Sequence, residues 1–118
     1  MHELALAEAV VAVAEVHANG RRVTGVELEV GRLRQVVPEA LSFSFELVAR
    51  GTVAEGAELV IDEVPVRLIC RSCGSATEPE AFPFACARCG GFDVEVTDGE
   101  QFQVIALELE EVEVVGSK

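Results

Sequence analysis

Two short segments decide the fold of this chain: Cys70-Arg71-Ser72-Cys73-Gly74 and Cys86-Ala87-Arg88-Cys89-Gly90. They hold all four cysteines of the chain, and residues 74–85 lie between Cys73 and Cys86. With two residues between the thiols of a pair, both sulfurs can turn toward one point, and the glycine that follows suits a tight turn. Two such turns facing each other form the tetrahedral four-sulfur cage that Zn²⁺ prefers.

The cysteine spacing leaves other chemistries open. Two disulfides would fit an extracellular protein, but no secretory signal pattern opens the chain. A thioredoxin-like pair needs a single C-x-x-C at the start of a helix, and neither pair has that setting. Iron fits four sulfurs as well as zinc does. Arg71 and Arg88 would offset part of the negative charge of a metal–thiolate centre, or they are ordinary solvated side chains. We favour a structural tetrathiolate zinc site.

Size and charge exclude several classes of protein. The 118 residues, half of them hydrophobic, suffice for one small domain plus a metal-held lobe. No apolar run approaches the roughly 20 residues that span a bilayer. Acidic residues outnumber basic ones 21 to 9, for a net charge of −12, whereas nucleic-acid affinity needs clustered Lys and Arg. We expect a cytoplasmic protein that binds neither nucleic acid nor membrane.

A first helix is predicted over residues 2–19. This stretch is rich in alanine and ends at Asn19-Gly20, a natural C-terminal stop. At 100° per residue, one apolar face is expected to contain Leu6, Val10, Val13 and His17. His17 is therefore expected to be a packed or last-turn histidine rather than a metal ligand.

Three strands and a second helix complete the predicted fold. Alternating polarity indicates strands over residues 22–30, 58–63 and 101–111. Pro38 suits the first turn of a helix that runs to Gly51. The fold class is thus α+β: a small three-stranded sheet covered by two helices, with an inserted zinc-ribbon-like lobe that carries the four cysteines.

The domain boundaries follow from this order of elements. Residues 1–65 plus 100–118 are expected to form an α/β domain, and residues 66–99 the zinc-binding lobe between its last two strands. The lobe has few apolar side chains, so we expect it to lose order when the metal is removed.

The first residues of the chain offer a second, different set of donors. A histidine at position two is most often a solvated side chain. However, the Met1 amine, the His2 backbone nitrogen and His2 Nδ1 can close a five-membered and a six-membered ring on one cation, and the Glu3 amide can add a fourth nitrogen. Planar nitrogen sets favour Ni(II) or Cu(II). Because every donor must lose a proton, such binding is sensitive to pH and readily reversed.

Several segments resemble those of one known family. They are the opening Met1-His2-Glu3-Leu4, the stretch Val23-Thr24-Gly25-Val26, residues 45–56 and the paired C-x-x-C motifs. Together these resemble the HypA/HybF family of hydrogenase nickel-incorporation metallochaperones. The likeness spans nearly the whole chain and keeps the family's order.

The resemblance implies two metal sites. The nickel site uses His2, with Met1 and Glu3 contributing backbone nitrogens; a role for the Glu3 side chain is less well defined. A structural zinc is held by Cys70, Cys73, Cys86 and Cys89. The domain formed by residues 1–65 plus 100–118 is then the nickel-binding one. Residues 74–85 contain no His or Tyr, so extra metal ligands in this loop are not expected.

The same resemblance implies the cargo and the partners. Ni²⁺ is transient cargo, handed with a nickel-insertion GTPase to the large subunit of a [NiFe]-hydrogenase, and some relatives also supply urease. The chain is expected to be a monomer or weak homodimer. No nucleophile–base motif or phosphate loop is present in the sequence, so we do not expect an enzyme. The alternative function is a zinc-ribbon adapter without nickel, which gives the first three residues no role.

Overall fold

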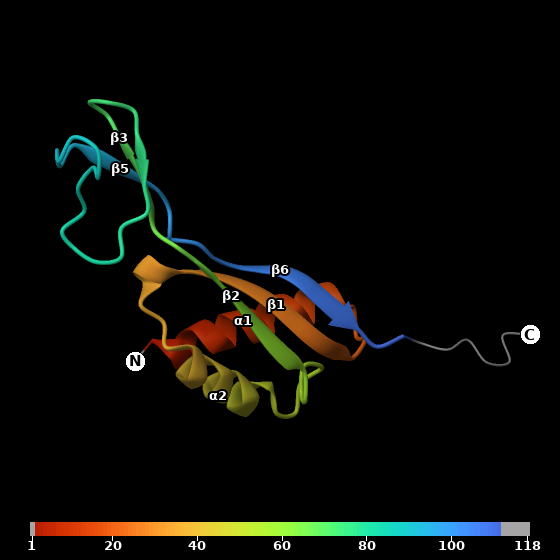
Figure 1. Cartoon of the computed structure of the whole chain (residues 1–118). Helices are drawn as coiled ribbons and strands as arrows, with labels where there is room; N and C mark the ends of the chain where they lie inside the picture. The colour runs from red at the N-terminus through yellow and green to blue at the C-terminus, as the bar shows by residue number, and fades with distance from the viewer. Residues whose placement is uncertain (1, 112–118) are drawn as a thin grey trace, which may run out of the picture. The chain divides into compact units, whose positions relative to one another are not determined.

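The computed structural model describes residues 2–111, and its α+β architecture confirms the predicted fold class. Two helices lie on one face of a three-stranded sheet with strand order β2-β1-β6 (Figure 1). The elements of this part are α1 (Glu3–Ala18), β1 (Val23–Gly31), α2 (Pro38–Ala49), β2 (Glu58–Val64) and β6 (Phe102–Leu109). No helix in the described part of the chain has the length and hydropathy of a membrane span.

Helix α1 ends where the sequence predicted, but its buried face is rotated from the predicted one. Asn19 adopts the left-handed conformation (φ 54°) and Gly20 follows with φ 81°, so the chain turns away from the helix. Of the predicted face, Val10 is buried and Leu6 is half-buried, whereas Val13 and His17 are exposed. The buried residues are Glu3, Ala7, Val10, Val11, Ala14 and Ala18. Small alanine side chains let α1 approach its neighbours closely. Because the apolar periodicity of the helix is weak, this close packing decides which face is buried.

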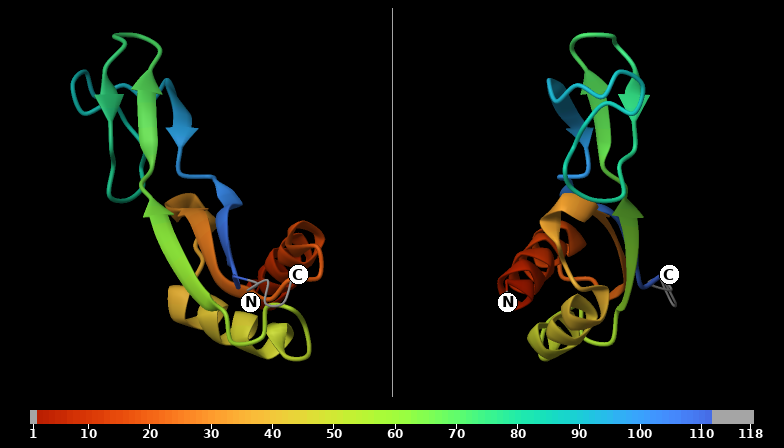
Figure 2. Two further views of the ribbon diagram at one scale, coloured as in Figure 1. Left: turned by 90° about the vertical axis from the view of Figure 1, so that its right-hand side faces the viewer. Right: turned by 60° about the vertical axis from the view of Figure 1, so that its left-hand side comes forward.

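Helix α2 and strand β1 supply the larger side chains of the core. Pro38 occupies the first turn of α2, where its missing N–H leaves no helical bond unmade. Leu41 and Phe45 of α2 are buried, as are the alternate residues Val26 and Leu28 of β1. Figure 2 shows the helices on one side of the sheet, which explains why β1 is apolar on that side and carries Glu27 and Glu29 between its buried residues.

The cysteine-containing segment has a sheet of its own, which the sequence did not predict. Strands β4 (Ala76–Thr77), β3 (Arg67–Cys70) and β5 (Val94–Asp98) form an antiparallel sheet in the order β4-β3-β5. Leu68 pairs with Thr77 on one side and Val96 on the other and is fully buried. The strands are too short to give a period-two signal, so their pairing depends on the loops that bring them together.

Contacts divide the chain into two compact units. The first contains the residues up to Leu28, Val37–Val60 and the residues from Val104 onward. The second contains Glu29–Val36 and Ile61–Gln103. The second unit therefore includes the end of β1 and the short 3-10 helix η1 (Arg32–Arg34) as well as the cysteine segment.

Two backbone segments of the second unit cross closely at Gly31. This residue has an ordinary extended backbone (φ −74°), but a Cβ built on it would overlap the carbonyl group of Gly99. Hydrogen bonds fasten the crossing: the Gly31 N–H donates to the Gln101 carbonyl at 2.6 Å and the Leu33 N–H to the Gly99 carbonyl at 2.8 Å. Glycine is therefore required at position 31 for steric reasons alone.

Gly31→Ala is expected to lower the free energy of unfolding by about 3 kcal/mol, because the new methyl group forces the two segments apart. Gly51→Ala is the control: Gly51 has φ 79° and open space where a Cβ would lie, so it reports only the backbone cost of about 1 kcal/mol. Urea unfolding of both variants measures the difference. Equal losses in the two would contradict the steric argument.

Candidate metal centre

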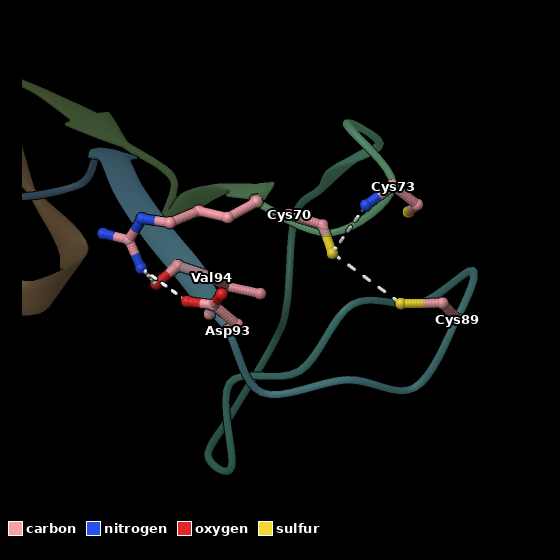
Figure 3. Close-up of polar contacts among 6 residues, drawn as sticks. Cys70, Cys73, Cys89, Asp93 and Val94 are labelled. Atoms are coloured by element: carbon pink, nitrogen blue, oxygen red, sulfur yellow. Dashed lines mark hydrogen bonds and ion pairs between the residues drawn. The ribbon is translucent and has the colours of Figure 1, made fainter.

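The four cysteine sulfurs converge in the second unit. One ligand atom from each of Cys70, Cys73, Cys86 and Cys89 lies within 4.8 Å of all the others. Figure 3 shows Cys70 at the end of β3 facing Cys89 from the opposite turn, with the two sulfurs 3.7 Å apart. The Cys73 and Cys86 sulfurs are 3.5 Å apart. None of these four thiols is in a disulfide.

Each C-x-x-C pair forms the same tight turn. The Gly74 N–H donates to the Cys70 carbonyl at 2.8 Å, and the Gly90 N–H donates to the Cys86 carbonyl at 2.9 Å. Both glycines have positive φ, 79° and 75°. Within each turn the N–H of the second cysteine points at the sulfur of the first, at 3.5 Å and 3.4 Å. Such N–H groups stabilise a thiolate, so the turns are built to hold negative sulfur.

The sulfur spacing fits a single tetrahedral ion. Zinc–sulfur bonds of about 2.3 Å in tetrahedral geometry place the sulfurs about 3.8 Å apart, close to the 3.5 Å and 3.7 Å contacts found. Cys70 and Cys86 are buried, whereas Cys73 and Cys89 are exposed. One side of the centre is thus shielded by the lobe, and the other faces water. Zn²⁺ bound here would fix the two turns to each other.

The thiols differ in how easily they ionise. Hydrogen bonds from the Ser75 hydroxyl and backbone lower the pKa of Cys73 to about 6. The backbone N–H of Cys89 lowers the pKa of Cys86. The Gly91 N–H also lowers the pKa of Cys89, but hydrogen bonds with neighbouring sulfurs outweigh it and raise that pKa to about 11. A metal ion must therefore displace a proton from Cys89, so binding releases protons.

Arg71 has a partner that the sequence did not reveal. Its guanidinium donates to the Asp93 carboxylate at 2.9 Å and to the Val94 carbonyl at 3.4 Å (Figure 3). Its backbone N–H donates to the Asp93 carbonyl, also at 2.9 Å. Arg71 therefore fastens the first cysteine turn to the start of β5. The side chain is still exposed, as expected of a solvated arginine, and its ion pair with Asp93 is the additional finding.

The predicted nickel residues lie at the start of α1. His2 is exposed and precedes the first helical residue, and its carbonyl accepts the Leu6 N–H at 3.0 Å. Glu3 is buried, with 6% of its surface exposed, and its Oε2 accepts the N–H of Val37 at 3.2 Å. Met1, which carries the terminal amine, lies outside the described residues. The structure thus shows an exposed His2 beside an anchored Glu3.

The Glu3 carboxylate is held in its charged form. Hydrogen bonding with the terminal ammonium group is the largest cause and the Val37 N–H the next, and they lower the pKa of Glu3 from 4.5 to about 2. A carboxylate in the first turn also complements the helix dipole. Glu3 consequently links the first turn of α1 to the residue that precedes α2, across 34 residues of sequence.

Glu3→Gln should make the fold less stable at neutral pH and indistinguishable from wild type near pH 2. Because the folded-state pKa is depressed, the contribution of Glu3 is complete above pH 4.5 and is lost as pH falls toward about 2. Urea unfolding followed by helical circular dichroism at several pH values tests this. A stability difference that does not change between pH 7 and pH 2 would contradict it.

His17 lies in the last turn of α1, as predicted, but it is exposed rather than packed. Its Nδ1–H donates to the Val13 carbonyl at 3.0 Å. The Val13 carbonyl lies one turn before the end of α1, so this bond folds the imidazole back along the helix. His17 belongs to none of the groups of at least three potential ligands found among residues 2–111.

Comparison with known proteins settles the family. Residues 1–109 match the family described as "Hydrogenase/urease nickel incorporation, metallochaperone, hypA". The chain belongs to the HypA family. The match includes both the first residues and the cysteine pairs, and it confirms the resemblance predicted from the sequence. This is a family of maturation metallochaperones rather than of enzymes.

HypA relatives match over nearly their whole length. The Hydrogenase maturation factor HypA of Geobacter metallireducens is 44% identical over 110 residues, covering 93% of this chain and 100% of the relative. The protein of the same name from Geobacter sulfurreducens gives the same identity and coverage. The solution structure of the Ni metallochaperone HypA from Helicobacter pylori superposes with a TM-score of 0.65 at 23% identity, over 92% of this chain and 97% of that one. It supports the HypA fold.

Proposed function

We propose that this chain carries Ni²⁺ at its amino terminus and delivers it to a nickel enzyme. The ligands are the Met1 amine, the backbone nitrogens of His2 and Glu3, and the His2 imidazole. The recipient is the large subunit of a [NiFe]-hydrogenase, reached with the help of a nickel-insertion GTPase; urease is a second recipient class. The observation that carries this proposal is the family match, which begins at residue 1.

The surroundings of His2 support a reversible site. His2 is exposed, and its side chain makes no capping hydrogen bond to α1. Next to it, Glu3 is fixed by the Val37 N–H. The His2 imidazole is therefore open to solvent and lies next to a fixed residue. Because the Glu3 carboxylate already has protein partners, we assign Glu3 a backbone nitrogen ligand and a positioning side chain.

We further propose that Cys70, Cys73, Cys86 and Cys89 hold a structural Zn²⁺. A closed set of four sulfurs leaves no open position for a substrate, as is typical of structural zinc. In this assignment residues 1–65 plus 100–118 carry nickel and residues 66–99 carry zinc. The protein acts in the cytoplasm as a monomer or weak homodimer and has no catalytic turnover of its own.

Metal analysis of untagged protein tests the proposal. We expect one zinc per chain before exposure to nickel, and one zinc plus one nickel after exposure and desalting. Zinc should survive mild chelation that strips nickel, because four thiolates hold it. If nickel displaced zinc atom for atom, the cysteine site would be the nickel site and the proposal would be wrong.

A further inference from the structure

Strand β6 presents a free edge. It is the outer strand in the order β2-β1-β6, and within residues 2–111 no other strand pairs with its far side. An edge of this kind has main-chain N–H and C=O groups directed away from the sheet, and a second extended chain can pair with them.

A groove runs beside this edge in the first unit. Its volume is about 350 Å³, and its lining includes Val13, His17, Val104, Ile105, Leu107 and Leu109. Val13 on α1 is 38% exposed and Ile105 on β6 is 45% exposed. The hydrogen bond from His17 Nδ1 to the Val13 carbonyl holds the imidazole on the α1 side of the groove. The free edge is thus flanked by apolar surface that a side chain of an added strand can cover.

The charge of residues 102–111 indicates the charge that a bound segment should carry. Glu108, Glu110 and Glu111 are acidic, and no Lys or Arg occurs between Phe102 and Glu111. Arg21 donates to the Glu110 main-chain carbonyl at 2.9 Å, so its hydrogen bond there does not involve the carboxylate. Together with the net charge of −12, this favours a basic partner and opposes pairing of two copies of this edge.

We propose that the β6 edge binds an extended basic segment of a partner protein as an additional strand. Side chains alternate along a strand, so apolar residues of that segment enter the groove beside Val13 and Ile105 while its Lys or Arg residues lie near Glu108 and Glu110. The inference does not rest on nickel binding. It uses residues that take no part in either metal site.

A synthetic probe tests the proposal on the full chain. A fluorescent, capped peptide with alternating Lys and Val, three of each, should bind in fluorescence anisotropy. Ile105→Arg should weaken binding by about tenfold or more, because it both fills the groove and repels the lysines. Leu47→Arg is the matched control: Leu47 is 41% exposed on α2, outside the lining of the groove, and the charge change is the same. It should alter binding less than about twofold.

Control peptides and a second variant distinguish a basic strand from other occupants of the edge. A peptide of the same composition with the lysines and valines in blocks should bind more weakly, and a Glu–Val repeat should not bind. If Ile105→Arg does not fold, Val13→Arg provides the same test, because Val13 lines the groove on the α1 side. The proposal is overturned if both Arg variants on the groove bind like Leu47→Arg, or if the peptide with blocks of lysine and valine binds equally well. If the peptide binds only to a chain truncated after Glu111, residues 112–118 are the occupant of the edge and the proposal is overturned. If Ile105→Arg converts a dimer to a monomer, the occupant is a second copy of the chain and the proposal is likewise overturned.

Discussion

Replacing Cys86 with alanine is expected to unfold the cysteine lobe while helices α1 and α2 persist. Cys86 is one of two buried thiols, and its turn holds Cys89 in place through the Gly90 N–H. Removing it leaves three sulfurs and an empty side of the cage. Structural zinc contributes roughly 10–16 kcal/mol in small zinc peptides, far more than the few apolar residues of this lobe can replace.

Amide exchange should locate the loss. Protection at the N–H groups of Gly74 and Gly90 should disappear, together with that of β3 and β5, because these bonds depend on the two turns facing each other. The core around Leu41 and Phe45 belongs to the other unit, so the helical circular dichroism should remain.

Ser72→Ala is the control for Cys86→Ala. Ser72 is an exposed residue inside the first C-x-x-C turn, and its replacement leaves all four thiolates. It should keep both zinc and protection. If zinc-free Cys86→Ala retained a protected β3–β5 pair, the lobe would fold without metal, and the argument that zinc organises it would fail.

Replacing His2 with alanine should weaken nickel binding by about 100-fold or more without changing the fold. The imidazole closes the six-membered ring of the proposed chelate, and even the loss of an outer partner of a metal ligand costs roughly 10–100-fold in affinity. His2 is exposed and precedes α1, so its side chain adds little to packing. Zinc content and thermal unfolding should match wild type.

His17→Ala is the matched control in the same titration. It removes the other histidine of the chain, which is also exposed and lies in the last turn of α1. Isothermal titration calorimetry should show unchanged nickel affinity for this variant. A comparable loss in both would indicate that the histidines bind nickel together, which the proposed N-terminal site does not allow.

Much of the fold was predictable because its signals are local. The end of α1 at Asn19 and the start of α2 at Pro38 depend on backbone preferences of those residues alone. Alternation along β1 and β6 was visible for the same reason. The convergence of the four cysteines also followed from spacing, since each pair fixes its own turn.

Other features depend on partners far away in the sequence. The buried face of α1 was predicted only in part, with Val10 correct and Val13 and His17 wrong, because alanine and valine occur around the whole helix and only its packing selects one side. The Glu3–Val37 contact joins residues 34 positions apart, and the Arg71–Asp93 contact joins residues 22 positions apart. No periodic pattern in the sequence predicts either contact. The crossing at Gly31 likewise becomes visible only when Gly99 lies beside it.

The central claim is that Ni²⁺ is held by the terminal amine together with His2. Nickel titration of protein acetylated at the Met1 amine tests it most directly, since acetylation leaves every side chain in place but removes the amine as a nitrogen donor. We predict that tight nickel binding is lost while one zinc per chain remains. Undiminished nickel affinity in the acetylated protein would contradict the claim.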